Sequence, residues 1–175
     1  MQATPAAGFV DIYMEQLSLA TQQNLPLVTP LMASLMINTG CNSRCTYCWI
    51  WKDTHKNTPL TDLCLAVDEL AALQVRQLCF TGGEPFLHPE LPQLIRYSRS
   101  KPMFTAVITN GTLLKSPRLQ PVLEAAPNVL AVSLDTLDPQ TYQAIRGVPL
   151  AGVLEGLARV VEESRRFPRV SVHVN

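Results

Sequence analysis

The residues best suited to chemistry are three cysteines in one short loop. Cys41, Cys45 and Cys48 follow the spacing C-x3-C-x2-C. Thiolates are soft ligands that suit zinc or an iron–sulfur cluster. A structural zinc site needs four ligands in a closed shell, and His55 is the only further candidate within the loop. Three thiolates on a four-iron cube leave one iron open to an outside ligand, so the spacing favours a cluster that binds a substrate.

The remaining cysteines and the composition narrow the class of protein. The five cysteines of the chain are an odd number, and three of them fall within eight positions, which does not suggest a disulfide framework. Cys64 and Cys79 lie in an expected helix and an expected strand, and we interpret both as small buried side chains. The formal net charge is zero, so nothing points to nucleic acid or to a charged membrane surface as a partner.

Targeting signals are also not apparent. Residues 1–9 contain no Lys or Arg ahead of an apolar run, so a secretory signal is not expected. No apolar stretch has the length needed to span a bilayer. The expected location is therefore the cytoplasm.

Polar or glycine-containing clusters follow the first four expected strands. The cysteine loop is the first of these clusters, and the others are Thr81-Gly82-Gly83-Glu84-Pro85, Thr109-Asn110-Gly111, and Ser133 with Asp135. In parallel α/β barrels the active site is built at the face where the strands end. Each cluster alone could also be an ordinary turn or helix cap, because such loops are rich in turn and capping residues. Four of them on one rim favour a functional site.

The elements that position these clusters alternate between strand and helix. Strands are expected at 31–38, 76–80, 105–109, 129–134 and 170–174, and helices at 60–73, from His88-Pro89, from Ser116-Pro117, from Asp138-Pro139 and at 153–161. This alternation predicts an α/β fold of βαβ units with a parallel sheet. Residues 1–30 are expected to form a leader and linker, with a short helix at 11–20, and residues 31–175 the core.

The last strand has one polar and one apolar face. Ser171, His173 and Asn175 alternate with Val170, Val172 and Val174, and strand side chains alternate between faces. Helices cover the outside of a parallel barrel, so we expect the valines to pack against them and the polar residues to face the lumen.

With these features in place, the sequence resembles the radical S-adenosylmethionine (SAM) superfamily. The cysteine loop with Tyr47 before its last cysteine, and Gly82-Gly83-Glu84 after the second strand, match the two hallmarks of that family. The residues around the cysteines, Trp49-Ile50-Trp51-Lys52 and Ile145-Arg146-Gly147 resemble the subgroup of peptide maturases and the GTP cyclase of molybdenum-cofactor synthesis. The resemblance covers 31–175. It implies a partial parallel (β/α) barrel of usually six strands, of which about five are present, so the core is expected to be incomplete at its C-terminal end.

The resemblance also implies the cofactors and the reaction. The three thiolates would hold a [4Fe–4S] cluster, and SAM would bind the open iron. An electron donor such as flavodoxin or ferredoxin would drive cleavage of SAM to a 5′-deoxyadenosyl radical, which abstracts hydrogen from a peptide or small organic substrate. The alternative is a non-catalytic module that binds zinc or an iron–sulfur cluster. The Gly-Gly-Glu motif favours the enzyme, because a carrier needs no amino-acid pocket.

The same resemblance gives the second hallmark motif a role. Gly82 and Gly83 would let the backbone approach the methionine part of SAM, where a Cβ would clash. Glu84 would accept a hydrogen bond from the SAM ammonium group.

Five further residues are expected around SAM. Ser133 and Asp135 would contact the ribose hydroxyls or the methionine end, or else cap the end of a strand. Asn110 lies at the same rim. Arg146 would pair with the SAM carboxylate through its planar fork, or else be an exposed arginine at a helix end. The Tyr47 backbone would lie near the adenine, or its side chain would only pack.

Overall fold

The computed structural model describes residues 9–23 and 30–175 and divides the chain into two units, Met1–Pro30 and Leu31–Asn175. The described part of the first unit contains helix α1 (Phe9–Gln23), which is longer than the expected helix at 11–20. Residues 24–29 of the expected linker lie outside the described residues. The second unit contains all the predicted site residues.

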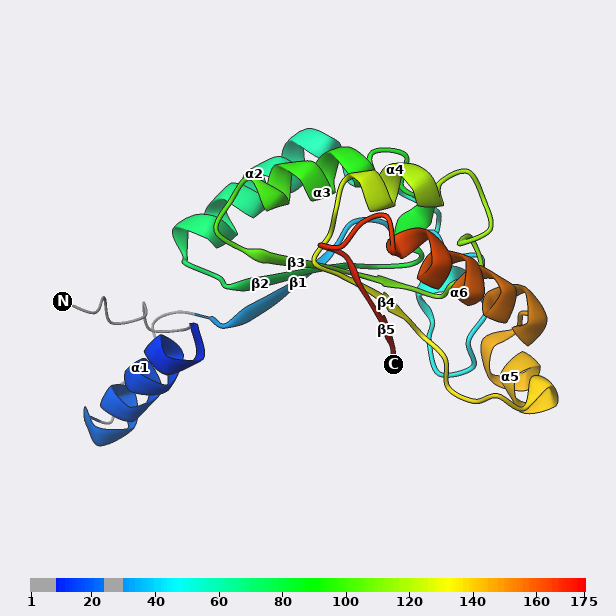
Figure 1. Ribbon diagram of the computed structural model, residues 1–175, viewed down its shortest axis with the longest axis horizontal. Coiled ribbons are helices and arrows are strands. Elements are labelled where there is room, and N and C mark those ends of the chain that lie inside the picture. The colour runs from blue at the N-terminus through cyan, green and yellow to red at the C-terminus, as the bar shows by residue number, and fades with distance from the viewer. Residues whose placement is uncertain (1–8, 24–29) are drawn as a thin grey trace. The chain divides into compact units, whose positions relative to one another are not determined.

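The second unit is built on one parallel sheet whose strand order follows the chain (Figure 1). Every neighbouring pair is parallel, and the order β1-β2-β3-β4-β5 confirms the predicted α/β class and the partial barrel. Among the described strands β1 does not pair with β5, so the sheet stays open. The strands are β1 (Met32–Met36), β2 (Gln77–Thr81), β3 (Phe104–Thr109), β4 (Val129–Val132) and β5 (Ser171–Val174).

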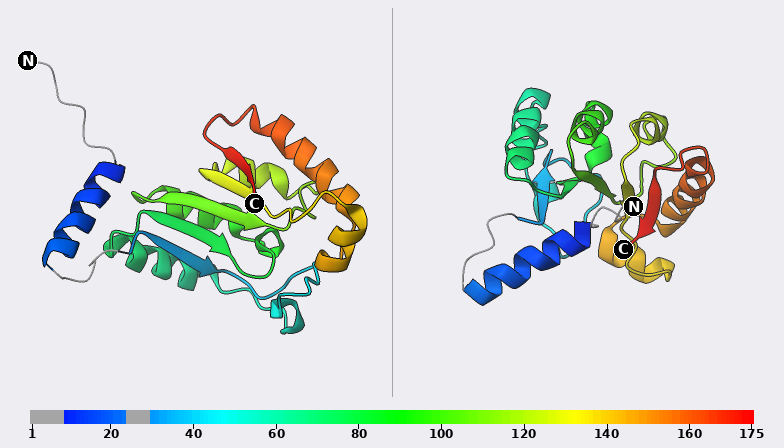
Figure 2. Two further views of the ribbon diagram at one scale, coloured as in Figure 1. Left: turned by 90° about the horizontal axis from the view of Figure 1, so that it is seen from below. Right: turned by 60° about the vertical axis from the view of Figure 1, so that its left-hand side comes forward.

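Helices cover one face of this curved sheet (Figures 1 and 2). A single apolar core fills the space between them and includes Leu78, Phe80, Val107 and Leu130 from the central strands. Right-handed βαβ crossovers place successive helices on the same side of a sheet. The α-helices of this unit are α2 (Leu60–Ala72), α3 (Leu91–Arg99), α4 (Leu119–Glu124), α5 (Pro139–Arg146) and α6 (Leu150–Ser164).

The opposite face of the sheet carries small side chains at its centre. The register places Ser34, Cys79 and Ala106 side by side, and His173 beside Ala131. Cys79 is buried as predicted. The centre of the helix-free face therefore carries small side chains, and those of Cys79, Ala106 and Ala131 are buried.

The predicted faces of the last strand are confirmed except at its end. Val170 is buried and Val172 packs against the apolar core, whereas Ser171 and His173 are exposed. Val174 was also expected to pack against the helices, but it is exposed, so the prediction is wrong at this position. The prediction for Cys64 is wrong, because this residue of α2 is partly exposed.

Of the three helix starts predicted from a capping residue, one is right and two are displaced. Asp138 caps α5, since its carboxylate accepts a hydrogen bond from the Thr141 N–H at 2.8 Å. Helix α3 begins only at Leu91, not at His88-Pro89, because a 3-10 turn, η2 (Pro85–Leu87), comes first. The His88 ring accepts the Glu90 N–H at 3.2 Å, so it caps the turn before the helix.

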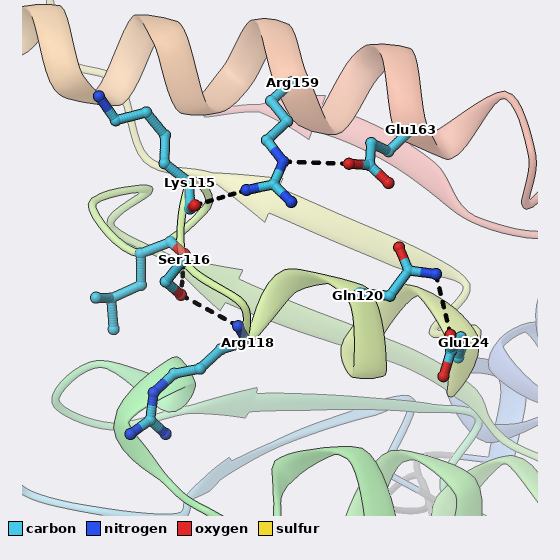
Figure 3. Close-up of polar contacts among 8 residues, drawn as sticks. Lys115, Ser116, Arg118, Gln120, Glu124, Arg159 and Glu163 are labelled. Carbon is cyan, nitrogen blue, oxygen red and sulfur yellow. Dashed lines mark hydrogen bonds and ion pairs between the residues drawn. The ribbon is translucent and has the colours of Figure 1, made fainter.

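Helix α4 likewise starts after the predicted Ser116-Pro117. Ser116 Oγ donates to the Leu113 carbonyl at 2.6 Å and accepts from the Arg118 N–H at 3.3 Å, forming a turn before the helix (Figure 3). Arg159 of α6 donates to the Lys115 carbonyl at 2.5 Å and to Glu163 at 3.1 Å (Figure 3). The loop that follows β3 is therefore fixed to its neighbouring helix.

Candidate cofactor site

A cavity of about 160 Å³ lies where the strands end and collects most of the predicted site residues. Loops after β1, β2, β3 and β4 all contribute to it, as expected for the carboxyl end of a parallel sheet. The predicted residues that line it are Cys41, Cys45, Tyr47, Cys48, Gly82, Gly83, Asn110, Ser133 and Arg146. Glu84 and Asp135 are the two predicted residues outside the lining. A larger cavity, about 290 Å³, lies between η2, α3 and α4 and contains none of the predicted residues.

The cysteine loop is held by its own backbone and by a tryptophan. Cys45 is buried, and Cys41 and Cys48 are partly exposed. The Cys45 carbonyl accepts from the Cys48 N–H and from Trp51 Nε1, both at 3.2 Å. Within residues 9–23 and 30–175, no three His, Cys, Asp or Glu side chains form a group that could hold one metal ion.

Ser43, between the first two cysteines, has an unusual environment. Its hydroxyl is buried, lines the cavity and has no hydrogen-bond partner among the described residues. Buried polar atoms almost always have a partner, so this hydroxyl indicates a ligand in the cavity. Burial raises the pKa of the Cys41 thiol, and hydrogen bonds from the Ser43 N–H and from Asn110 act in the opposite direction. Three cysteines in one loop, with hydrogen-bond donors beside Cys41, are the type of ligand set that suits an iron–sulfur cluster.

The two glycines of the second hallmark line the cavity and also allow close backbone contacts within the protein. A Cβ on Gly83 would lie 1.9 Å from the Gly40 carbonyl oxygen, and a Cβ on Gly82 would lie 2.4 Å from the Asn38 carbonyl oxygen. Gly82 also has a φ of +134°, which side chains rarely adopt. The close approach that requires glycine is therefore to the cysteine loop, which the Glu84 N–H also contacts through the Gly40 carbonyl at 2.7 Å.

Glu84 does not reach the cavity. Its side chain is fully buried, and its carboxylate accepts from the Thr109 hydroxyl at 2.7 Å, the Asn110 N–H at 2.7 Å and the Phe86 N–H at 3.1 Å. Burial raises the pKa of Glu84 to about 7, although these hydrogen bonds lower it. The carboxylate joins the loops after β2 and β3, and its expected contact to the SAM ammonium group stays a prediction.

Asn110 joins the loop after β3 to the cysteines. Its Nδ2 donates to Asn42 Oδ1 at 2.9 Å and lies 3.8 Å from Cys41 Sγ. Its Oδ1 accepts from the Thr112 N–H at 3.0 Å and from the Thr112 hydroxyl at 2.6 Å. Sequence reasoning missed Asn42 and Thr112, which bond to Asn110, because nothing in their own spacing marks them.

Arg146 and Asp135 bond to each other. Arg146 donates from Nε at 2.5 Å and from Nη2 at 2.8 Å to the two carboxylate oxygens of Asp135. Arg146 is only 8% exposed, so the alternative of an exposed helix-end arginine is wrong. The Tyr47 ring lies 5.5 Å from the guanidinium carbon, and its hydroxyl donates to Asp135 at 3.4 Å. Hydrogen bonds from Arg146 lower the pKa of Asp135.

Comparisons with known proteins agree with this geometry. The model of the radical SAM superfamily matches residues 35–174. The GTP 3',8-cyclase of Chlorobaculum tepidum is 36% identical over 115 residues, which are 63% of this chain and 34% of the cyclase. A SAM-dependent nucleotide dehydratase of Selenomonas ruminantium is 32% identical over 114 residues, which are 64% of this chain and 42% of the dehydratase.

Solved structures share the fold. Streptococcus suis SuiB bound to SAM superimposes with a TM-score of 0.68 at 17% identity, over 97% of this chain and 40% of SuiB. SuiB bound to its precursor peptide SuiA superimposes with a TM-score of 0.65 at 16% identity, over 98% of this chain and 39% of SuiB.

An open parallel sheet with a three-cysteine loop at its carboxyl end defines the class of radical SAM enzymes. The chain belongs to the radical SAM superfamily, whose cofactors are a [4Fe–4S] cluster and SAM. It spans between a third and a half of the length of the two sequence relatives above. No helix in the described part of the chain is long and apolar enough to cross a membrane.

Proposed function

We propose that Cys41, Cys45 and Cys48 bind the [4Fe–4S] cluster and that SAM occupies the adjoining cavity. The proposal rests on one observation, which is that the three cysteines and the ends of strands β2 to β4 line the same cavity. When bound, the cluster supplies the electron that cleaves SAM to a 5′-deoxyadenosyl radical, which abstracts hydrogen from the substrate.

The chain itself positions these cofactors. Glu84 and Asn110 tie the loops after β2 and β3 to the cysteine loop. The Ser133 hydroxyl lines the cavity and makes no hydrogen bond to another described residue, so it is free to bind SAM. The indole Nε1 of Trp51 fixes the backbone of Cys45. These contacts hold the loops in place before the cofactors bind, which is the protein's share of cofactor catalysis.

The substrate is proposed more broadly, as a peptide or a small organic molecule. The relatives are named for a GTP cyclisation and a nucleotide dehydration, and SuiB was solved with a precursor peptide. We place such a molecule on the helix-free face of the sheet, where the small side chains of Ser34, Cys79 and Ala106 lie side by side. We further propose a cytoplasmic protein with residues 31–175 as its radical SAM core, residues 1–30 as a leader, and an electron donor such as flavodoxin or ferredoxin as its partner.

Anaerobic reconstitution tests the proposal. The chain should bind four iron and four sulfide, become brown, change its spectrum when SAM is added, and form 5′-deoxyadenosine with dithionite. The variant with all three loop cysteines replaced by alanine is the matched control and should do none of these. Colourless protein with one zinc per chain would overturn the proposal and support the non-catalytic module.

A further inference from the structure

The end of helix α5 packs directly on the Cys45 segment. The Ile145 carbonyl accepts from the Thr46 N–H at 2.9 Å, and the Arg146 carbonyl accepts from the Arg44 N–H at 3.0 Å. Carbonyls in the last turn of a helix have no partner within the helix. Here two of them bind the residues on either side of Cys45, so the helix end fixes the backbone of this ligand.

Gly147 makes this contact possible. It ends α5 in the left-handed conformation, with a φ of 69°, which glycine adopts without strain. A Cβ at this position would lie 3.0 Å from Arg44 Cβ and 3.2 Å from the Arg44 carbonyl oxygen. A larger residue would therefore push the cysteine loop away from the helix.

The Arg146 side chain also contacts the Cys45 segment. Its Nη1 lies 3.9 Å from Cys45 Sγ, while Nε and Nη2 are held by the Asp135 carboxylate. The Tyr47 ring lies beside the guanidinium group. With its side chain only 10% exposed, Arg146 is a fixed cation directed at one ligand sulfur.

We propose that Ile145-Arg146-Gly147 clamps Cys45, and that Arg146 is a positioning residue that makes one-electron reduction of the cluster more favourable. The inference rests on the proposed function, since it assumes that Cys45 binds the cluster. Reduction adds one negative charge to the cluster. A nearby cation that donates a hydrogen bond to a ligand sulfur stabilises the reduced form, and such hydrogen bonds are among the factors that set the potential of iron–sulfur clusters.

The test compares Arg146→Gln, which loses the charge, with Arg146→Lys, which keeps the charge but loses the planar guanidinium group that binds both carboxylate oxygens of Asp135. Arg169→Gln removes an exposed arginine from the loop between α6 and β5 and serves as the control. Iron and sulfide content and the midpoint potential of the cluster, followed by EPR without SAM, are measured for each reconstituted protein. In Arg146→Gln the equilibrium constant for reduction should fall at least tenfold, a potential about 59 mV more negative for one electron. Arg146→Lys should recover part of this change, and Arg169→Gln should match the wild type.

The outcomes separate this inference from the proposed function. A folded Arg146→Gln protein that loses iron shows that the Arg146 side chain takes part in the clamp, and one that keeps iron at a lower potential supports the effect on reduction. Full iron content with the wild-type potential overturns the inference alone. If Arg146→Gln does not fold, Arg146→Lys tests the role of the guanidinium geometry. Wild-type iron content and potential in Arg146→Lys would overturn that role, and a more negative potential would support it. A wild-type chain that binds no iron overturns the proposed function, and this inference with it.

Discussion

The change Glu84→Gln tests how the buried carboxylate is held between the loops. Glu84 has a pKa of about 7 in the folded protein, against an ordinary value of 4.5. Because the folded state binds this proton more tightly than the unfolded state, the carboxyl contributes full stability below pH 4.5. That contribution is lost as the pH rises towards 7. The difference between the folded and the ordinary pKa of Glu84 corresponds to about 3 kcal/mol in the free energy of unfolding.

Glutamine at position 84 does not titrate, and it lowers the stability of the folded protein by an amount that does not depend on pH. Three donors face the carboxylate, from Phe86, Thr109 and Asn110. The threonine hydroxyl can turn to accept from the new amide NH2 group, but in either orientation of the amide one backbone N–H faces that NH2. An unsatisfied buried N–H costs ~1–3 kcal/mol at every pH. The variant should therefore have a lower free energy of unfolding than the wild type at pH 4.5. Between pH 4.5 and pH 7 the free energy of unfolding of the wild type should fall by about 3 kcal/mol relative to that of the variant.

Urea unfolding of the reduced apoprotein, followed by circular dichroism from pH 4.5 to pH 8, measures both chains. Subtracting one free energy of unfolding from the other cancels the titration of groups distant from Glu84. A difference that stays constant over this range, or that moves in favour of the wild type, would refute the reasoning. It would mean that water or a rearranged loop relieves the burial of the carboxylate.

Four further changes test the loops and the helices. Cys45→Ala should abolish cluster assembly, because two thiolates cannot hold the cube, and wild-type iron content after reconstitution would contradict this. Gly83→Ala should lower both iron content and the free energy of unfolding, because its Cβ would lie 1.9 Å from the Gly40 oxygen; unchanged iron binding would count against that packing. In α6, Gly152→Ala should raise the free energy of unfolding by ~0.4–1 kcal/mol, since nothing lies within 4 Å of the new Cβ. Gly156→Ala should lower it by ~1–3 kcal/mol, because its Cβ would lie 2.9 Å from a side chain of the β3–α4 loop. Urea titrations that found equal effects for these two glycines would refute the comparison.

Local patterns in the sequence were sufficient to predict the order of the elements. Alternating apolar runs predicted the parallel sheet, and the period of two predicted which face of β5 carries Ser171 and His173. Asp138 predicted the start of α5, because capping involves only neighbouring residues. The start of α3 was misplaced, because both a 3-10 turn and a helix can follow His88-Pro89.

The contacts of the site join residues from different loops and helices, and the sequence could not supply them. The motif placed Glu84 at the correct rim but did not reveal that Thr109 and Asn110 cover its carboxylate. Arg146 and Asp135 were each expected to bind SAM, whereas the fold pairs them with each other. Two opposite charges brought together by tertiary packing leave no local pattern.

The sequential strand order has a consequence for synthesis on the ribosome. Because each strand pairs with the next one made, the sheet can grow as the chain emerges, and domains fold largely as they are synthesised. The contact between Arg146 and Cys45, however, joins residues 101 positions apart. A nascent chain that has exposed all three cysteines still lacks the helix end that fixes the middle one. We therefore expect stable insertion of the cluster only after α5 has left the ribosome, and until then the thiols of the loop stay open to oxidation.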